Sequence, residues 1–175
     1  AMDALSACPT GGRLVAVSSG GMYNTKWPGI AKASSTAPKS VEQYDGQYSY
    51  ACAKRGQVLL CERWAKDFSS RSNLRVVSAH PGWTATPGVD AAYGEKKKYL
   101  GNMRTPWQGA EGIAWLCVAS LSKIKNGEFY LDRSPQAKHI SGPFYTQGWH
   151  TWNTKEEVDT MMSNLNKWSS SSTRP

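Results

Sequence analysis

Long apolar runs are missing from this 175-residue sequence, and no stretch of 18 apolar residues occurs. We therefore expect no transmembrane helix. The N-terminus has no basic region followed by a long apolar core, which predicts no secretory signal peptide. The four cysteines form no CxxC pair, and the three histidines complete no zinc-binding spacing, so no metal site is predicted. Reduced thiols are the simplest interpretation, and they favour a cytoplasmic protein.

Acidic residues are few, 13 against 21 lysines and arginines, and the net charge is +8. Such a balance raises nucleic-acid binding as a function. The basic residues are scattered apart from Lys96–Lys98, and no basic stripe alternates with aromatic residues. We therefore interpret the charge as a solvated basic surface, which could also attract a phosphate-bearing cofactor, and we predict no nucleic-acid partner.

Apolar residues are arranged in two kinds of segment. Three short runs predict strands, and three longer segments with helical periodicity predict helices, two of which begin with a threonine capping box. The predicted strands are 13–18, 74–79 and 127–131, and the predicted helices are 48–68, 105–123 and 154–168. The segment 23–43 is a predicted loop, and 169–175 a disordered tail. This alternating order predicts an α/β fold with parallel strands and helical crossovers.

The stretch Tyr44–Gly56, YDGQYSYACAKRG, contains a pair with chemical potential. Tyr50 precedes Lys54 by four residues, so on a helix both side chains lie on one face, one turn apart. An ammonium at that distance favours the ionised phenolate, which equips a tyrosine to exchange a proton with a carbonyl or an alcohol. The spacing is common in helices, and its structural alternative is a packed ring beside a solvated lysine.

The surroundings of this pair resemble the C-terminal half of a short-chain dehydrogenase/reductase. The tyrosine follows a strand that ends in VSSGGM and precedes a strand that ends in HPGWTATPGV. Similar ERWA and F-Y-x-D-R stretches occur in one subgroup of the family. In this sequence VSSGGM is 17–22, the tyrosine–lysine pair spans 50–54, ERWA is 62–65, HPGWTATPGV is 80–89 and FYLDR is 129–133. The resemblance covers about residues 11–135.

The resemblance implies catalytic roles for three residues. Tyr50 would be the acid/base of an NAD(P)-dependent oxidoreductase that transfers hydride between a carbonyl and an alcohol. Lys54 would favour the ionised form of Tyr50 and bind the nicotinamide ribose, so that both residues also contact the cofactor. Ser19 would orient the substrate oxygen. In the family the tyrosine-bearing helix often packs a dimer interface, which implies a homo-oligomer through helix 48–68.

The resemblance also implies binding residues in the loops after the second strand. Pro81, Gly82 and Thr86 match the loop that lies against the nicotinamide and phosphates. The segment 83–107 matches the mobile substrate-binding segment, and its aromatic residues imply a small apolar carbonyl or alcohol, although buried aromatics are as often core. The aromatic candidates are Trp83, Tyr93, Tyr99 and Trp107.

One part of the family pattern has no match in the sequence. The glycine-rich turn T-G-x-x-x-G-x-G, which cradles the dinucleotide pyrophosphate, is absent. We therefore expect residues 1–168 to form the catalytic half of a Rossmann-type doubly wound sheet, with about three parallel strands and no N-terminal dinucleotide-binding half. NADP or NAD would then bind only if that half is supplied. The alternative is a truncated, inactive fragment that acts in dimerisation or partner binding.

Overall fold

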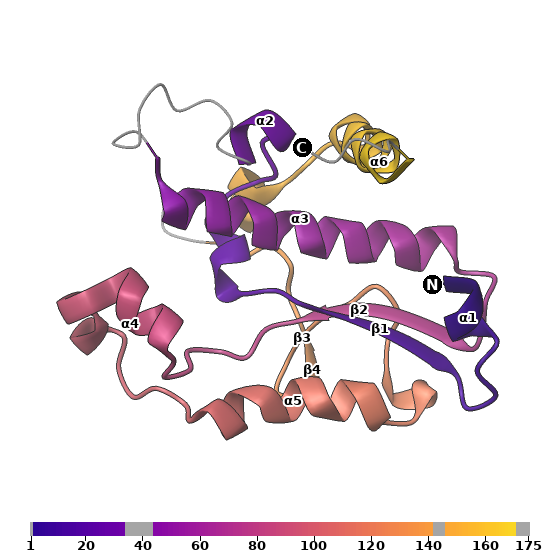
Figure 1. The fold of residues 1–175 in the computed structure, drawn as a ribbon, viewed down its shortest axis with the longest axis horizontal. Helices are drawn as coiled ribbons and strands as arrows, with labels where there is room; N and C mark the ends of the chain where they lie inside the picture. The colour runs from indigo at the N-terminus through magenta and orange to yellow at the C-terminus, as the bar shows by residue number, and fades with distance from the viewer. Residues whose placement is uncertain (1, 34–43, 142–145, 171–175) are drawn as a thin grey trace. The chain divides into compact units, whose positions relative to one another are not determined.

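The computed structural model describes residues 2–33, 44–141 and 146–170 (Figure 1). The chain forms two compact units. The first contains residues 1–20 and 61–138, and the second contains residues 21–60 and 139–175. In the described part of the chain, no helix combines the length and the apolar character that crossing a membrane requires.

Strands and helices alternate along the chain much as predicted. The strands are β1 (Gly12–Val17), β2 (Leu74–Ala79), β3 (Phe129–Leu131) and β4 (Ser134–Gln136). The α-helices are α1 (Met2–Ser6), α2 (Ile30–Ala33), α3 (Gly46–Asp67), α4 (Pro87–Tyr93), α5 (Pro106–Val118) and α6 (Lys155–Ser170). Short 3-10 helices are η1 (Gly20–Tyr23), η3 (Gly94–Tyr99), η4 (Leu121–Lys123) and η5 (Thr146–Thr151).

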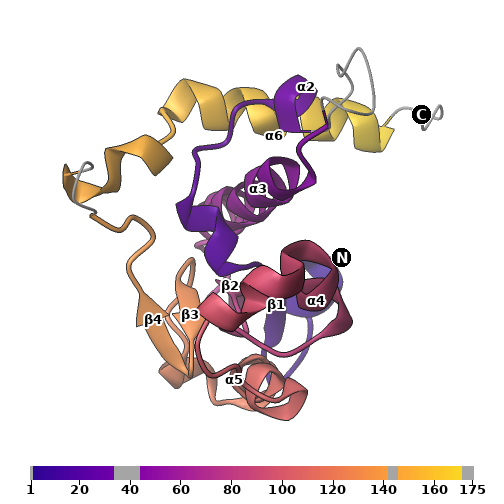
Figure 2. The same cartoon turned by 90° about the vertical axis from the view of Figure 1, so that its left-hand side faces the viewer.

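The four strands form one sheet in the order β1-β2-β3-β4. Strands β1, β2 and β3 are parallel, and Leu14 lies opposite Val76 in the register of the first pair. This arrangement confirms the predicted α/β fold class with a largely parallel sheet. Strand β4 was not predicted; it pairs with β3 in the antiparallel direction and forms a hairpin beside α5, visible in Figure 2.

Helices cover both faces of the sheet in the first unit (Figure 1). Cys61 and Ala65, in the last turns of α3, pack with Leu74 and Val76 on one face. On the other face, Leu116 of α5 and its neighbours pack with the alternate residues of β2. Alternation along β2 therefore divides the core into two layers, because successive side chains of a strand point to opposite faces.

Threonine capping boxes begin helices α5 and α6, as predicted. At α5, the Gln108 N–H donates to Thr105 Oγ1 at 3.2 Å, and the Thr105 N–H donates to Gln108 Oε1 at 2.9 Å. The same exchange links Thr154 and Glu157 at the start of α6. Each box satisfies two N–H groups that a helix start would otherwise leave without an intrahelical acceptor.

The second unit contains the first part of α3 and the C-terminal segment. Its largest fully buried side chain is Arg55. Its guanidinium lies 3.4 Å from Met22 Sδ and 3.3 Å from His139 Nε2. Gly56, the next residue, faces the Trp27 ring so closely that an added Cβ would lie 2.9 Å from Cε3. The part of α3 before residue 61 therefore has a buried face within the second unit. Oligomerisation through this helix stays a prediction.

Several boundaries differ from the sequence predictions. Those of β1, α3 and β3 differ by one or two residues, and three further differences concern α2, α5 and α6. Part of the predicted 23–43 loop forms helix α2, and residues 34–43 lie outside the described residues. Helix α5 ends at Val118, and only a short 3-10 turn, η4, continues toward Lys123. Helix α6 extends to Ser170, two residues into the predicted tail, while 171–175 lie outside the described residues.

Candidate active site

The loops after β1 and β2 lie side by side at the carboxyl edge of the sheet. The Ser18 N–H donates to the Ala79 carbonyl at 2.7 Å, which extends the ladder one residue past the end of β1. An added Cβ on Gly20 would lie 4.0 Å from Cε1 of His80. The first predicted loop, which contains Ser19, therefore neighbours the start of the second, as parallel strands require.

His80 is the first residue of the second loop and is held at three places. Its backbone N–H donates to the Tyr130 carbonyl at 3.0 Å, and its ring stacks on Phe129 with centroids 5.1 Å apart. Its Nδ1 accepts a hydrogen bond from the Gly82 N–H at 3.2 Å. Burial, and then the positive charge of Arg104, lower the pKa of His80. The neutral ring consequently carries its proton on Nε2.

Glycine is required at two places around the turn that follows His80. Gly82 has a φ of +73°, and an added Cβ would lie 2.8 Å from Arg104 Nε. Thr84, which is buried, donates from Oγ1 to the Pro81 carbonyl at 3.2 Å. Gly109 of α5 packs on Thr84, since an added Cβ would lie 2.4 Å from its Oγ1. The turn is therefore enclosed by Arg104 and by the first turns of α5.

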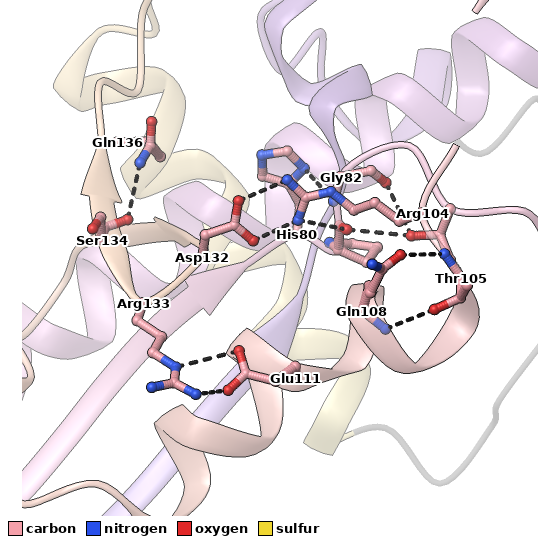
Figure 3. A network of polar contacts seen from close by, with 12 residues as sticks. His80, Gly82, Arg104, Thr105, Gln108, Glu111, Asp132, Arg133, Ser134 and Gln136 are labelled. Atoms are coloured by element: carbon pink, nitrogen blue, oxygen red, sulfur yellow. Dashed lines mark hydrogen bonds and ion pairs between the residues drawn. The ribbon is translucent and has the colours of Figure 1, made fainter. Parts of the chain in front are cut away.

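Arg104 joins this turn to the β3–β4 hairpin through Asp132. Two guanidinium N–H groups donate to the two carboxylate oxygens, with Nη2 and Oδ2 2.6 Å apart (Figure 3). This hydrogen bonding holds the pKa of Asp132 below its ordinary value and raises that of Arg104. The backbone of Arg104 also contacts the turn, because its N–H donates to the Trp83 carbonyl at 2.8 Å.

The hairpin turn that carries Asp132 has an unusual backbone. Asp132 and Arg133 have φ values of 50° and 65°, so both central residues of this two-residue loop are left-handed. That geometry matches the twist of a hairpin but is uncommon for residues with a side chain. Arg133 forms a second ion pair with Glu111 of α5, with Nε donating to Oε2 at 3.2 Å (Figure 3). The two residues of the turn therefore pair in different directions, Asp132 with Arg104 and Arg133 with α5.

The remaining predicted residues of the first unit lie at separate places along 83–107. Thr86 caps α4, and its Oγ1 accepts from the Val89 N–H at 3.3 Å. Trp83 and Tyr93 meet edge to face with centroids 5.5 Å apart. Tyr99 is exposed and has the Lys98 ammonium over its ring, and Trp107 is 78% exposed. The fold thus brings two of the four aromatic candidates together.

Tyr50 and Lys54 lie one turn apart on α3, in the second unit. The Lys54 ammonium nitrogen is 5.4 Å from the centre of the Tyr50 ring, and the Tyr50 side chain is half exposed. The predicted same-face relationship is therefore present. Ser19 belongs to the first unit, and its meeting with Tyr50 stays a prediction.

Sequence reasoning missed Arg104 as a member of this region. Arg104 belongs to no motif in the sequence, and its partner Asp132 is 28 residues away. A weak indication was present, because Asp132 is part of the quoted F-Y-x-D-R stretch. The carboxylate could have been expected to need a cation, but nothing in the sequence identifies which of many basic residues provides it.

Two curated proteins match most of this chain, and the matched region is less than half of each of them. No family model matches the chain. Over 130 residues, 73% of the chain, it is 36% identical to Dehydrogenase/reductase SDR family member 12 of Homo sapiens. The Bos taurus protein of that name is 35% identical over 131 residues. These matches confirm the predicted resemblance to the short-chain dehydrogenase/reductase family. The chain spans 38% of the length of these curated relatives.

Two solved structures are similar to part of the chain. One is the angucycline C-6 ketoreductase LanV with bound NADP, with a TM-score of 0.44 and 23% identity; the match covers 73% of this chain and 44% of that one. The other is acetoin dehydrogenase from Enterobacter cloacae, with a TM-score of 0.44 and 21% identity; the match covers 69% of this chain and 41% of that one.

Proposed function

We propose that this chain supplies the catalytic half of an oxidoreductase of the short-chain type, which transfers hydride between a carbonyl and an alcohol. The observation that carries the proposal is the Tyr50–Lys54 pair, whose ammonium nitrogen and ring centre are 5.4 Å apart. In the proposed reaction, the Lys54 ammonium stabilises the negative charge that the phenol oxygen carries after it has given up its proton. The relationship to the dehydrogenase/reductase family supports the assignment.

The proposed proton chemistry needs three groups. The Tyr50 hydroxyl protonates the carbonyl oxygen during reduction and accepts the alcohol proton during oxidation. Lys54 favours the phenolate that remains after the proton has left, and its other N–H groups can bind ribose hydroxyls. Ser19 donates a hydrogen bond to the substrate oxygen and stabilises charge that develops there.

The residues of this chain fit the nicotinamide end of NADP or NAD, which supplies or accepts the hydride when bound. Their donor set is suitable, because Lys54 offers an ammonium and Tyr50 a half-exposed hydroxyl for ribose and substrate oxygens. Pro81, Gly82 and Thr86 would lie against the nicotinamide ring and phosphates. The sequence contains no glycine-rich pyrophosphate turn. The proposal therefore assigns only the nicotinamide end to this chain.

The proposed substrate is a small apolar carbonyl or alcohol. The edge-to-face pair of Trp83 and Tyr93 offers an aromatic surface in the segment 83–107. Trp83 is 49% exposed and directly follows the Pro81–Gly82 turn, so its ring is open to a ligand. Aromatic faces of this kind bind apolar groups without selecting one compound.

The test is a turnover assay on the natural protein that carries this sequence. Oxidation of NADH and NADPH is followed with apolar aldehydes and ketones. Tyr50→Phe is expected to lower kcat by about 10²- to 10⁴-fold. Tyr44→Phe is the matched control, because both side chains are about half exposed, 52% and 51%. Equal turnover in the two variants would remove Tyr50 from the mechanism.

A second candidate is a non-catalytic role in dimerisation or partner binding. Among the strands of the described residues, β1 lies at the edge of the sheet and pairs with β2 alone. An edge strand offers backbone groups to which a further strand can bind. This candidate predicts no turnover with either cofactor. The first candidate predicts turnover that depends on Tyr50.

A further inference from the structure

We propose that Arg104 and Asp132 form a clamp that positions the 80–84 turn against the nicotinamide end of the cofactor. Arg104 is then a positioning residue for hydride transfer rather than a catalytic one. The inference rests on the proposed function, because that function gives the turn a cofactor to contact. It goes further than that function because it assigns a role to the pair that joins the 80–84 turn to the β3–β4 hairpin.

Arg104 contacts the turn through both its side chain and its backbone. An added Cβ on Gly82 would lie 2.8 Å from the Nε and 2.9 Å from the Cζ of Arg104, so the guanidinium lies directly against this glycine. The Arg104 N–H donates to the Trp83 carbonyl at 2.8 Å, and its carbonyl accepts from the Ala85 N–H at 2.9 Å. The turn consequently cannot shift unless Arg104 moves with it.

Asp132 sets the orientation of the guanidinium. The paired N–H groups and carboxylate oxygens fix the plane of the Arg104 fork, which a single hydrogen bond would leave free to rotate. Asp132 stands in the two-residue turn of the β3–β4 hairpin, where its φ is 50°. Figure 3 shows this chain of contacts from the hairpin through Arg104 to Gly82. The hairpin therefore acts as the fixed support of the clamp.

His80 supports the other side of the same turn. Its Nδ1 accepts from the Gly82 N–H at 3.2 Å, and Phe129 stacks on the ring. Gly82 thus lies between a ring that binds its N–H and a guanidinium that occupies the space of a side chain. Because burial and the charge of Arg104 lower the pKa of His80, Nδ1 keeps its lone pair for this bond.

The clamp is better explained by positioning than by stability. Its side chains are 31% and 55% exposed, and ion pairs this exposed contribute little to the free energy of folding. A misplacement of about 1 Å at a reacting centre, in contrast, can cost about 10²-fold in rate. A pair that fixes the backbone beside the cofactor ring therefore has its main consequence in catalysis.

The hairpin offers a matched control in the Glu111–Arg133 pair. It joins α5 to the same turn and has similar exposure, 36% and 53%, and the structure gives it no contact with 80–84. Glu111→Gln therefore removes an ion pair from the hairpin without removing the clamp. Arg104→Met and Asp132→Asn remove the clamp, and Arg104→Lys keeps the charge but loses the planar fork.

The experiment measures steady-state kinetics and amide hydrogen exchange in the natural protein and these four variants. We expect Arg104→Met, Arg104→Lys and Asp132→Asn to raise the KM for the cofactor and so to lower kcat/KM for the cofactor about ten- to a hundredfold, with the KM for the carbonyl unchanged. Exchange at the Ala85 and Arg104 amides should accelerate in the same variants. Glu111→Gln should leave both measurements at the wild-type value. A purely structural role would lower the active fraction and leave the cofactor KM unchanged.

Each alternative outcome has a separate meaning. If turnover depends on Tyr50 while the clamp variants keep the wild-type cofactor KM, the clamp is wrong and the proposed function stands. If the wild-type protein shows no cofactor-dependent turnover, the proposed function fails, and the role of the clamp toward the cofactor fails with it. If Arg104→Lys behaves as wild type while Arg104→Met does not, charge rather than fork geometry positions the turn, which overturns the clamp as proposed.

Discussion

The Lys54 ammonium nitrogen lies 5.4 Å from the centre of the Tyr50 ring, one helical turn away on α3. A cation over a ring face is attracted by the π electrons of the ring. The contact therefore holds the two side chains together on one face of the helix. Tyr44 and Tyr48 have no lysine four residues later, so this relationship distinguishes one tyrosine of three.

Replacing Lys54 by methionine should impair turnover without unfolding the protein. The substitution keeps an unbranched side chain over the Tyr50 ring but removes the ammonium to which we assign the stabilisation of charge during proton transfer. We expect kcat to fall by roughly 10²-fold, within the range for an impaired acid/base group. Lys66→Met, on the same helix and exposed, is the control. If kcat is equal in the two variants, the proposed role of Lys54 is wrong.

Gly109 should not tolerate a side chain, although it lies in a helix. Alanine would ordinarily stabilise a helix interior by about 1 kcal/mol relative to glycine. At Gly109 the new Cβ would lie 2.4 Å from Thr84 Oγ1, and forced shifts of this kind cost about 1–3 kcal/mol. We expect the clash to outweigh the helix preference and Gly109→Ala to lower the free energy of unfolding.

Gly112, in the same helix, provides the comparison. Its added Cβ would have its nearest contact at 3.4 Å, from the Asp132 nitrogen, which is ordinary packing. Gly112→Ala should therefore be neutral or stabilise by up to about 1 kcal/mol. Urea unfolding of both variants measures the difference. Equal stability would mean that the Thr84 loop moves away from α5 at little cost.

Local patterns in the sequence predicted the elements that form the sheet and its covering helices. Strand β2 has the bounds that its apolar run predicted, and the threonines that begin α5 and α6 form the predicted capping boxes. These features depend on neighbours within a few residues, so the information is local. The Tyr50–Lys54 contact was predictable for the same reason, because helical spacing alone brings the two side chains together.

The hairpin and the clamp could not be predicted in this way. Strand β4 consists of Ser134, Pro135 and Gln136, which show no apolar alternation, and proline disfavours a strand except at an edge. The turn before it places Asp132 and Arg133 at positive φ, where glycine or asparagine is the usual residue. The ion pairs that these two residues make join parts of the chain more than 20 residues apart, and such pairs leave no periodic pattern in a sequence.

The stability of the protein should fall in mild acid partly because of His80. Burial is the main cause that lowers the pKa of His80 below its ordinary value of 6.5. The unfolded chain therefore binds a proton near pH 6.5 while the folded chain does not. The stabilising contribution is present above pH 6.5 and is lost as the pH falls toward the lower folded pKa.

His80→Asn should reduce this pH dependence. The ring is only partly buried, so the expected difference in unfolding free energy between pH 7.5 and 5.5 is below about 1 kcal/mol after allowance for solvent screening. Urea unfolding of the wild type and the variant at both values gives the difference directly. Because the other two histidines are present in both proteins, their titration cancels. An identical pH dependence in the two proteins would show that His80 titrates as an exposed residue.

The four free cysteines should differ strongly in their reaction with a thiol reagent. Cys61 is fully buried, and burial raises its pKa from 9.0 to about 12. Because the thiolate is the reactive form, this higher pKa reduces the reactive fraction of Cys61 by about a thousandfold before access is considered.

Cys117 is exposed and should react within the mixing time. Mass spectrometry of aromatic-disulfide adducts at pH 8 identifies the order, and raising the pH should accelerate Cys61. Labelling of Cys61 as fast as Cys117 in native buffer would contradict the packing of α3 on β2.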